Sequence, residues 1–263
     1  MKFAYARRLR MGDSKFIPDM AQLVANLSSP EYGEATRRLI NDSYTHPTSF
    51  YLDGLTSSMK EQGTSHISVV DGNGNAVAVT STINIYFGSA VMGEKTGIIY
   101  NDEMDDFSSP NETNYFNLPP SPENFIKPGK RPMSSMSPVN VLVSDEKNVG
   151  KKRIAQSLGA AGGSRITSAV AYISARMLWF DETPKQAIDA LRIHHQLLPE
   201  KLLYEVGMPQ IILDELMRTG HTNQTVYLAS KGVFSVAGAI QKVKNGTIFA
   251  NADFRKPAAT DGF

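Results

Sequence analysis

The sequence predicts an α+β protein, because strand signals and helix signals both recur along its 263 residues. Two strand–turn–strand patterns stand out, one around the turn at 71–74 and one around the turn at 146–150. Apolar residues at helical spacing lie between residues 166 and 178. The length fits one large domain or two small ones, with enough apolar sequence for a substantial core.

The overall composition narrows the classes of function. The chain carries 27 Lys and Arg against 26 Asp and Glu, so charge gives no argument for a nucleic-acid partner. Cysteine is absent, which excludes disulfides, thiolate metal sites and a cysteine nucleophile. The most apolar helical stretch, 167–180, is too short to cross a membrane and contains Arg176.

The first residues, MKFAYARRLRMGDSK, lack the apolar region of a signal peptide. The chain nevertheless contains five glycosylation sequons, which have meaning only in a secretory context. Sequons without a targeting segment favour a chain that has lost an N-terminal part, whereas accidental sequons in a cytosolic protein are the alternative. The sequons begin at Asn26, Asn41, Asn111, Asn223 and Asn245.

Residues 1 to about 45 are predicted to be helical, with Ser29 as an N-cap and Pro30 at the first helical position. His46-Pro47 should end this part and open a polar linker that runs to about Gly63. Strands at 66–70 and 75–83 should flank the turn Asp71-Gly-Asn-Gly74 as a hairpin.

Residues 101–140 are predicted to form mainly loops, because seven prolines lie among them. A second hairpin, a glycine turn, two helices and closing strands should follow. In chain order these are strands at 139–144 and 153–158, a turn at 159–163, helices from 166 and at 184–192, and strands at 226–228 and 233–243.

Thr64 is the first candidate for chemistry. A threonine hydroxyl needs a base to become a nucleophile. If the Gly63–Thr64 bond is cut, the new α-amino group of Thr64, with a pKa of about 7.7–8.0, becomes that base. With a hairpin turn centred on Asn73, Thr82 lies opposite Thr64 and can orient its hydroxyl. The alternative is that Thr64 simply begins a strand.

Three further segments carry candidate binding groups. The acidic run Asn101-Asp-Glu-Met-Asp-Asp106 can hold a cation or an ammonium group, or it is a solvated turn. Ser134-Ser135, braced by prolines, can hold a carboxylate, or they belong to an ordinary loop. Gly162-Gly163 before a helix can form an oxyanion hole or a phosphate nest, or a plain turn. The pair His194-His195 lacks metal-ligand spacing and is interpreted as structural.

Together these blocks resemble the small subunit of gamma-glutamyltranspeptidase, also called glutathione hydrolase. Residues 1–63 resemble the C-terminal end of that family's large-subunit region, and residues 64–263 its small-subunit catalytic region. The blocks are FAYARR and THPTSFY before Thr64, then TSHISVVDGNGN at 64–75, TSTINIYFGS at 80–89, NDEMDDFSSP at 101–110, PGKRPMSSMSP at 128–138, GAAGGSR at 159–165 and the ending ADFRKPAATDGF.

The resemblance implies an αββα sandwich of the N-terminal-nucleophile hydrolase type and self-cleavage between Gly63 and Thr64. Thr64 would attack γ-glutamyl substrates such as glutathione, and water or an acceptor amino acid or peptide would release the glutamyl group. No cofactor or metal is implied, and the location would be extracellular or at the cell surface. The implied helpers are Thr82 beside Thr64, Asn84, Glu103 and Asp106 for the substrate amino group, Ser134 and Ser135 for its carboxylate, and Gly162 and Gly163 for the oxyanion.

The family's large subunit also extends far upstream, and it supplies further strands and an arginine for the substrate carboxylate. Without that segment the sandwich should be incomplete, with unpaired edges and an uncovered apolar face. Two hypotheses therefore stand. The chain is a catalytic half that needs the missing large-subunit segment as its partner, or it is an inactive light-chain-like product that at most binds partners. A related acylase with another side-chain preference is a third reading.

Overall fold

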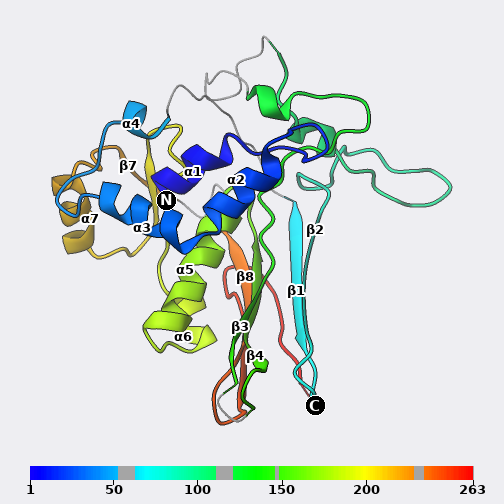
Figure 1. Cartoon of the computed structure of the whole chain (residues 1–263). Helices are drawn as coiled ribbons and strands as arrows, with labels where there is room; N and C mark the ends of the chain where they lie inside the picture. Colours follow the sequence, from blue (N-terminus) through cyan, green and yellow to red (C-terminus); the bar gives the residue numbers. More distant parts are fainter. Residues whose placement is uncertain (53–62, 111–120, 146–147, 228–233, 263) are drawn as a thin grey trace. The chain divides into compact units, whose positions relative to one another are not determined.

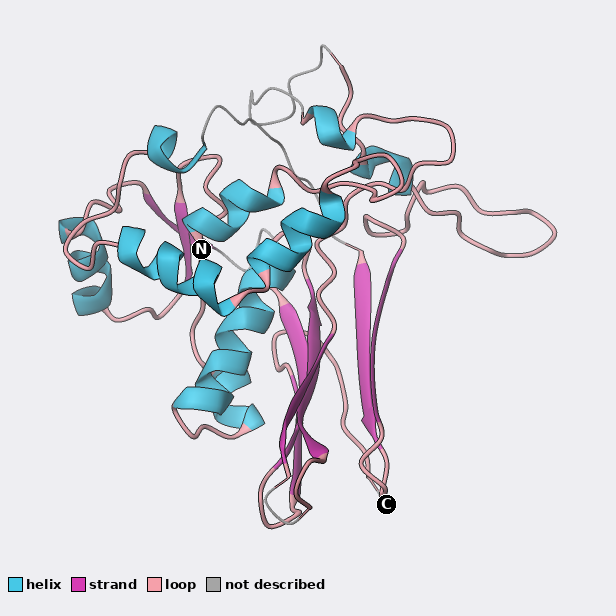
Figure 2. Ribbon diagram, viewed as in Figure 1, coloured by secondary structure: helices cyan, strands magenta, loops and turns pink. Residues whose placement is uncertain are grey.

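A computed structural model covers the chain and describes residues 1–52, 63–110, 121–145, 148–227 and 234–262 (Figure 1). The chain folds into two compact units, and each unit draws on several stretches of sequence. The first unit comprises Met1–Lys60, Glu103–Ser134 and Ile193–Tyr227, and the second comprises Glu61–Asp102, Ser135–Arg192 and Leu228–Phe263. Helices and strands occur in both (Figure 2), so the predicted α+β class is confirmed.

The first unit combines short helices with a three-stranded sheet of order β5-β6-β7. One of its cores joins Tyr5, Ala6, Tyr51 and Leu197. Its elements are α1 Lys2–Arg8, α2 Met20–Leu27, α3 Pro30–Leu39, α4 Thr48–Leu52, η1 Glu103–Asp106, η2 Pro122–Asn124, β5 Ile193–His194, β6 Leu202–Glu205, α7 Gln210–Arg218 and β7 Gln224–Tyr227.

Polar contacts also bind the start of the chain to residues near 200. The buried Lys2 ammonium donates to Thr45 Oγ1 and to the His46 carbonyl at 3.1 Å each. It also pairs with Glu200 at 3.3 Å. The rings of Tyr5 and His194 meet edge to face with centroids 5.6 Å apart. Residues 1–8 and 193–200 therefore pack as parts of one core.

The predicted helical start of the chain is confirmed in part. Ser29 caps α3 by accepting a hydrogen bond from the Tyr32 amide at 3.1 Å, and Pro30 occupies the first turn as predicted. The predicted linker after His46 is wrong at 48–52, where α4 forms because Tyr51 enters the core. Its remainder, 53–62, lies outside the described residues. The predicted strand at 226–228 corresponds to β7. The other two strands of this sheet and helix α7 were not predicted.

The second unit has three layers. The middle layer is the antiparallel sheet β3-β4-β8-β9, and the hairpin β1-β2 packs against it. Side chains alternate along β4: Leu158 and Ala160 join the core with α5 and α6, whereas Gly159 faces His66 of the hairpin. The elements are β1 Thr64–Val70, β2 Ala76–Thr82, β3 Val139–Ser144, β4 Lys152–Ala161, α5 Arg165–Trp179, α6 Pro184–Asp189, β8 Val236–Lys242 and β9 Ile248–Ala252.

Both predicted hairpins are confirmed, including the pairing of Thr64 with Thr82. The predicted glycine turn is wrong for residues 159–161, which continue β4 because they pair with β8. Only Gly162 and Gly163 turn. The second predicted helix ends at Asp189 instead of 192, and β9 was not predicted. Within the described residues, no helix combines the length and apolar character that crossing a membrane requires.

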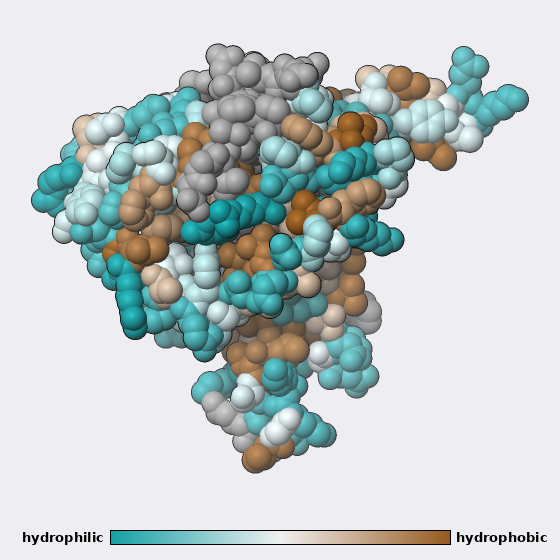
Figure 3. All heavy atoms as spheres, turned by 45° about the horizontal axis from the view of Figure 1, so that its top comes forward, coloured by the Kyte–Doolittle hydropathy of each residue, from teal (hydrophilic) through white to brown (hydrophobic). Residues whose placement is uncertain are grey.

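The hairpin β1-β2 has an inverted distribution of polarity. Its inner face, toward the sheet, carries hydroxyl groups and His66, whose ring bonds Thr80 Oγ1 at 2.8 Å and Ser68 Oγ at 2.9 Å. Burial lowers the pKa of His66. Its outer face is apolar: Ile67 is 60% and Val77 is 54% exposed. Apolar patches lie among hydrophilic residues in the space-filling view (Figure 3). Among the described residues of this unit, the outer face of the hairpin is thus an exposed apolar surface of the kind that the sequence predicts.

Gly159 is the point where the sheet and the hairpin approach most closely. A Cβ atom at this position would lie 2.2 Å from Cε1 of His66, so the ring leaves no room for a methyl group. We expect Gly159→Ala to lower the free energy of unfolding by about 1–3 kcal/mol, as overpacking does. In a His66→Ala background the same substitution should cost much less, which urea unfolding of the four chains measures. An equal cost in both backgrounds would contradict the contact.

Candidate active site

The hydroxyl groups of Thr64 and Thr82 face each other at the open end of the hairpin. Thr64 Oγ1 donates to Thr82 Oγ1 at 3.1 Å. Thr82 Oγ1 also accepts from the Asn84 amide at 2.9 Å and donates to the Gly63 carbonyl at 3.1 Å. The predicted helper hydroxyl is thus in direct contact with the predicted nucleophile, because the ladder places both side chains on one face.

Gly63 is held closely against the chain that follows β2. Its carbonyl oxygen accepts from the Ile83 amide at 3.2 Å in addition to the Thr82 hydroxyl. A Cβ atom on residue 63 would lie 2.3 Å from the Ile85 carbonyl oxygen. The glycine before Thr64 is therefore required by packing, and not only by the flexibility that the sequence indicates.

Asn84 follows β2 in a left-handed conformation, with φ of 72°. Such backbone is uncommon outside glycine, although asparagine tolerates it better than most residues. The side chain is 2% exposed and donates from Nδ2 to the Asp102 carbonyl at 3.3 Å. Its Oδ1 is buried and has no hydrogen-bond partner among the described residues. A buried acceptor without a partner is a place where a donor from a ligand can bind.

The acidic segment begins beside Asn84 and continues into the first unit. Asp102 Oδ1 accepts from the Ile85 amide at 3.3 Å, which ties this segment to the end of the hairpin. Glu103 and Asp106 lie on η1, a short 3-10 helix of the first unit. The Asp106 carbonyl accepts from Asn124 Nδ2 at 2.6 Å. Their predicted role toward an amino group stays a prediction.

The two serines fall at the boundary between the units, Ser134 in the first and Ser135 in the second. Ser135 is buried, and its carbonyl accepts from the Ser137 hydroxyl at 3.0 Å. Among the cations before them, Arg131 forms an ion pair with the fully buried Asp13 carboxylate at 3.0 Å. The hydrogen bonds from Arg131 hold the pKa of Asp13 well below its usual range. Lys130 donates to the Glu123 carbonyl at 2.6 Å. Both cations are therefore already engaged in contacts within the first unit.

The turn after β4 has a backbone that requires glycine. Gly162 and Gly163 have φ of 125° and 65°, which side-chain-bearing residues avoid. A Cβ atom on Gly162 would also lie 2.9 Å from Cα of Ser235. In Figure 1 this turn, between β4 and α5, lies at the same end of the second unit as the start of β1. The arrangement permits the oxyanion role that the resemblance implies, and that role stays a prediction.

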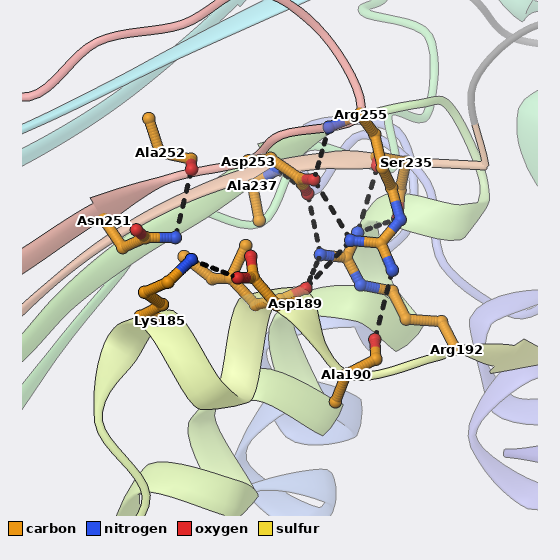
Figure 4. Close-up of polar contacts among 11 residues, drawn as sticks. Lys185, Asp189, Ala190, Arg192, Ser235, Ala237, Asn251, Ala252, Asp253 and Arg255 are labelled. Atoms are coloured by element: carbon orange, nitrogen blue, oxygen red, sulfur yellow. Dashed lines mark hydrogen bonds and ion pairs between the residues drawn. The ribbon is translucent and has the colours of Figure 1, made fainter.

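A buried ionic network lies behind Ser235 (Figure 4). Arg192 is 1% exposed and donates to the Ser235 hydroxyl at 2.7 Å and to its carbonyl at 3.0 Å. It pairs with Asp253 at 2.7 Å, and Asp253 also binds Arg255 at 3.1 Å. The Asp253 carboxylate also accepts from the backbone amides of Ala237 at 2.9 Å and Arg255 at 3.1 Å. The segment that abuts Gly162 is therefore fixed by residues near the C-terminus.

The histidine pair behaves as predicted for a structural role. His194 and His195 are both buried, and the Leu197 amide donates to His195 Nδ1 at 3.1 Å. Burial lowers the pKa of His195 to about 3, so its ring stays neutral. Among the described residues, no group of three or more His, Cys, Asp or Glu could hold a metal ion.

Several site residues escaped inference from sequence patterns alone. Asn84 was identified only through the resemblance, because an isolated Asn after a strand carries no pattern. Arg192 and Asp253 were not singled out, since nothing local shows that residues 61 positions apart will pair. The sequence offered only an arginine after a predicted helix and an Asp-x-Arg sequence near the end as signals.

Comparison with known proteins gives one consistent result. The family model for gamma-glutamyltranspeptidase matches residues 1–263. Scoloptoxin SSD14 of Scolopendra dehaani is 42% identical over the whole chain, which spans 43% of that protein. Scoloptoxin SSD20 of the same animal is 45% identical, and the match covers 76% of this chain and 96% of that protein. Glutathione hydrolase 2 of Arabidopsis thaliana is 41% identical over 78% of this chain and 34% of its own length.

Solved structures agree with the sequence comparison. A Helicobacter pylori gamma-glutamyltranspeptidase T380A mutant matches with a TM-score of 0.64 and 35% identity, over 73% of this chain and 99% of that chain. Cephalosporin acylase from Bacillus halodurans matches with a TM-score of 0.70 at 21% identity, over 100% of this chain and 44% of that chain, which shows a shared fold. The predicted N-terminal-nucleophile hydrolase type of sandwich is thereby confirmed, and the chain spans less than half of several relatives.

Proposed function

Because the chain belongs to the gamma-glutamyltranspeptidase family, we propose that it is the catalytic half of an enzyme that transfers or hydrolyses γ-glutamyl groups. The observation that supports this best is the contact of Thr64 with Thr82 next to the Gly63 carbonyl. A hydroxyl is placed at the peptide bond whose cleavage would free its own amino group, and that amino group can then act as base.

In the proposed reaction, Thr64 Oγ attacks the γ-glutamyl carbonyl of glutathione or a related compound. The Thr64 amine takes the hydroxyl proton and then protonates the leaving amine. An acyl-enzyme remains, and water or an acceptor amino acid or peptide releases the glutamyl group. The N–H groups at Gly162 and Gly163 stabilise the oxyanion.

Substrate recognition completes the proposal. The unpartnered Asn84 oxygen accepts from the substrate α-amino group, and the carboxylates of Glu103 and Asp106 complement its charge. Ser134 and Ser135 donate to the substrate α-carboxylate. A carboxylate leaving water also needs a cation, and Arg131 is already paired with Asp13. The cation therefore comes from the large-subunit segment that the longer relatives contain.

A second candidate function is binding without catalysis. The match to Scoloptoxin SSD20 covers 96% of that protein and 76% of this chain, so one relative is itself barely longer than the part of this chain that it matches. The apolar outer face of the hairpin would then be the surface that meets a partner. In either case we propose an extracellular or cell-surface location.

The deciding experiment is release of the anilide from a γ-glutamyl-anilide by the purified chain. We expect little or no turnover by the chain alone and clear turnover once the large-subunit segment of a close relative is fused upstream or added in trans. Thr64→Ala should abolish the restored activity. Turnover by the chain alone would show that the upstream segment is dispensable, and no turnover in either format would favour the binding function.

A further inference from the structure

The carbonyl group of the bond to be cut carries two hydrogen-bond donors. The Gly63 oxygen accepts from the Thr82 hydroxyl at 3.1 Å and from the Ile83 amide at 3.2 Å. Two donors on one carbonyl oxygen polarise the carbonyl and offset the negative charge that builds up on the oxygen during attack on its carbon. These donors belong to the hairpin, so they are distinct from the Gly162-Gly163 turn.

The direction of every hydrogen bond at Thr82 follows from its partners. A carbonyl oxygen only accepts, so Thr82 must donate its single proton to Gly63. An amide N–H only donates, so Thr82 accepts from Asn84 at 2.9 Å. The remaining lone pair accepts from the Thr64 hydroxyl at 3.1 Å. The Thr82 hydroxyl is therefore saturated, and it stands between the nucleophile and the carbonyl as one continuous chain of hydrogen bonds.

We propose that Thr82 is a proton relay for self-cleavage, a role that rests on the proposed function and precedes any reaction with substrate. As Thr64 Oγ bonds to the Gly63 carbon, its proton passes to Thr82 Oγ. The Thr82 proton passes at the same time to the Gly63 oxygen. The tetrahedral intermediate forms without net charge, which matters at a half-buried site because a charge without a partner is costly there.

The tetrahedral intermediate then collapses toward the ester. The carbonyl re-forms, the C–N bond to Thr64 breaks, and the proton on the Gly63 oxygen moves to the Thr64 nitrogen, giving a neutral amine and an ester. Water cleaves the ester, which leaves a carboxylic acid on Gly63 and restores the Thr64 hydroxyl. The Ile83 amide holds the Gly63 oxygen throughout. No other reactant is required.

The test compares Thr82→Val with Thr82→Ser in the full 263-residue chain, following fragments by mass spectrometry. Valine keeps the shape but removes the hydroxyl, and we expect the cut to slow by about 100-fold, as for a lost oxyanion donor. Serine keeps the hydroxyl and should cut within about tenfold of the parent. Hydroxylamine, which cleaves esters, should not rescue Thr82→Val, because the relay acts before the ester forms.

Each outcome of this test either supports the proton relay or contradicts it. Cutting of Thr82→Val at the parental rate, or its full rescue by hydroxylamine, would overturn the relay while leaving self-cleavage intact. An uncut parent would overturn self-cleavage itself, and the relay with it. If Thr82→Val does not fold, the rate of the parent in mixtures of H₂O and D₂O decides. Two protons in flight give a curved dependence on the deuterium fraction, and a linear dependence would refute the relay.

Discussion

Thr64→Ala should leave the chain uncut, whereas we expect the parent chain to yield fragments of 63 and 200 residues. The reason is direct: the substitution removes the hydroxyl that contacts Thr82 and that belongs to the residue directly after the bond to be cut. Removing a nucleophile typically lowers a rate by about 10⁶-fold, which places the cut below detection. Intact-mass measurement and N-terminal sequencing of the larger fragment check the result.

A matched control separates loss of chemistry from loss of structure. Thr80 lies on the same inner face of the hairpin, opposite His66, and its hydroxyl bonds the His66 ring at 2.8 Å. Thr80→Ala should cost some stability but retain the cut, because it leaves Thr64 and Thr82 in place. Equal cutting of Thr64→Ala and the parent would show that another group acts as nucleophile.

Asp253→Ala should cause the largest loss of stability among single substitutions in the second unit. Asp253 has no exposed side-chain surface, and it is the carboxylate that two buried arginines, Arg192 and Arg255, share. Its removal leaves those charges inside the protein without their anion, which typically costs about 3–5 kcal/mol. Urea unfolding of the parent and the variant measures this loss.

The surface pair of Lys185 and Asp189, also drawn in Figure 4, is the control for Asp253→Ala. Their side chains meet at 2.6 Å, but that of Lys185 is 75% exposed. Lys185→Ala should change the free energy of unfolding by about 0.5 kcal/mol or less, because water replaces the lost partner. Similar losses for both variants would show that burial of the Asp253 network contributes little.

Local chemistry explains why part of the fold could be predicted. The turn Asp71-Gly-Asn-Gly74 fixes the hairpin register, and that register alone places Thr82 opposite Thr64. The Ser29–Pro30 cap likewise acts within one helical turn. In each case the determining residues lie within about ten positions of the element that they define.

The features that escaped prediction depend on contacts between distant residues. Gly159 was assigned to a turn because glycine usually marks one, but here it provides space for His66 of another layer. Helix α4 forms in a polar stretch because Tyr51 finds a core made by residues far along the chain. The network of Arg192 and Asp253 is of the same kind, since burial of charges is decided by tertiary packing.

The make-up of the first unit has a consequence for the product of the cut. Met1–Lys60 shares that unit with Ile193–Tyr227. Residues from both sides of the Gly63–Thr64 bond therefore pack together in one unit. Tyr5 and Tyr51 lie in one cluster with Leu197, and Lys2 pairs with Glu200. We therefore expect scission to convert an interior into a subunit interface, so that the two polypeptides stay together in native buffer and separate only in denaturant. On this expectation, the heterodimer would arise by loss of one covalent bond, without any encounter between separate chains.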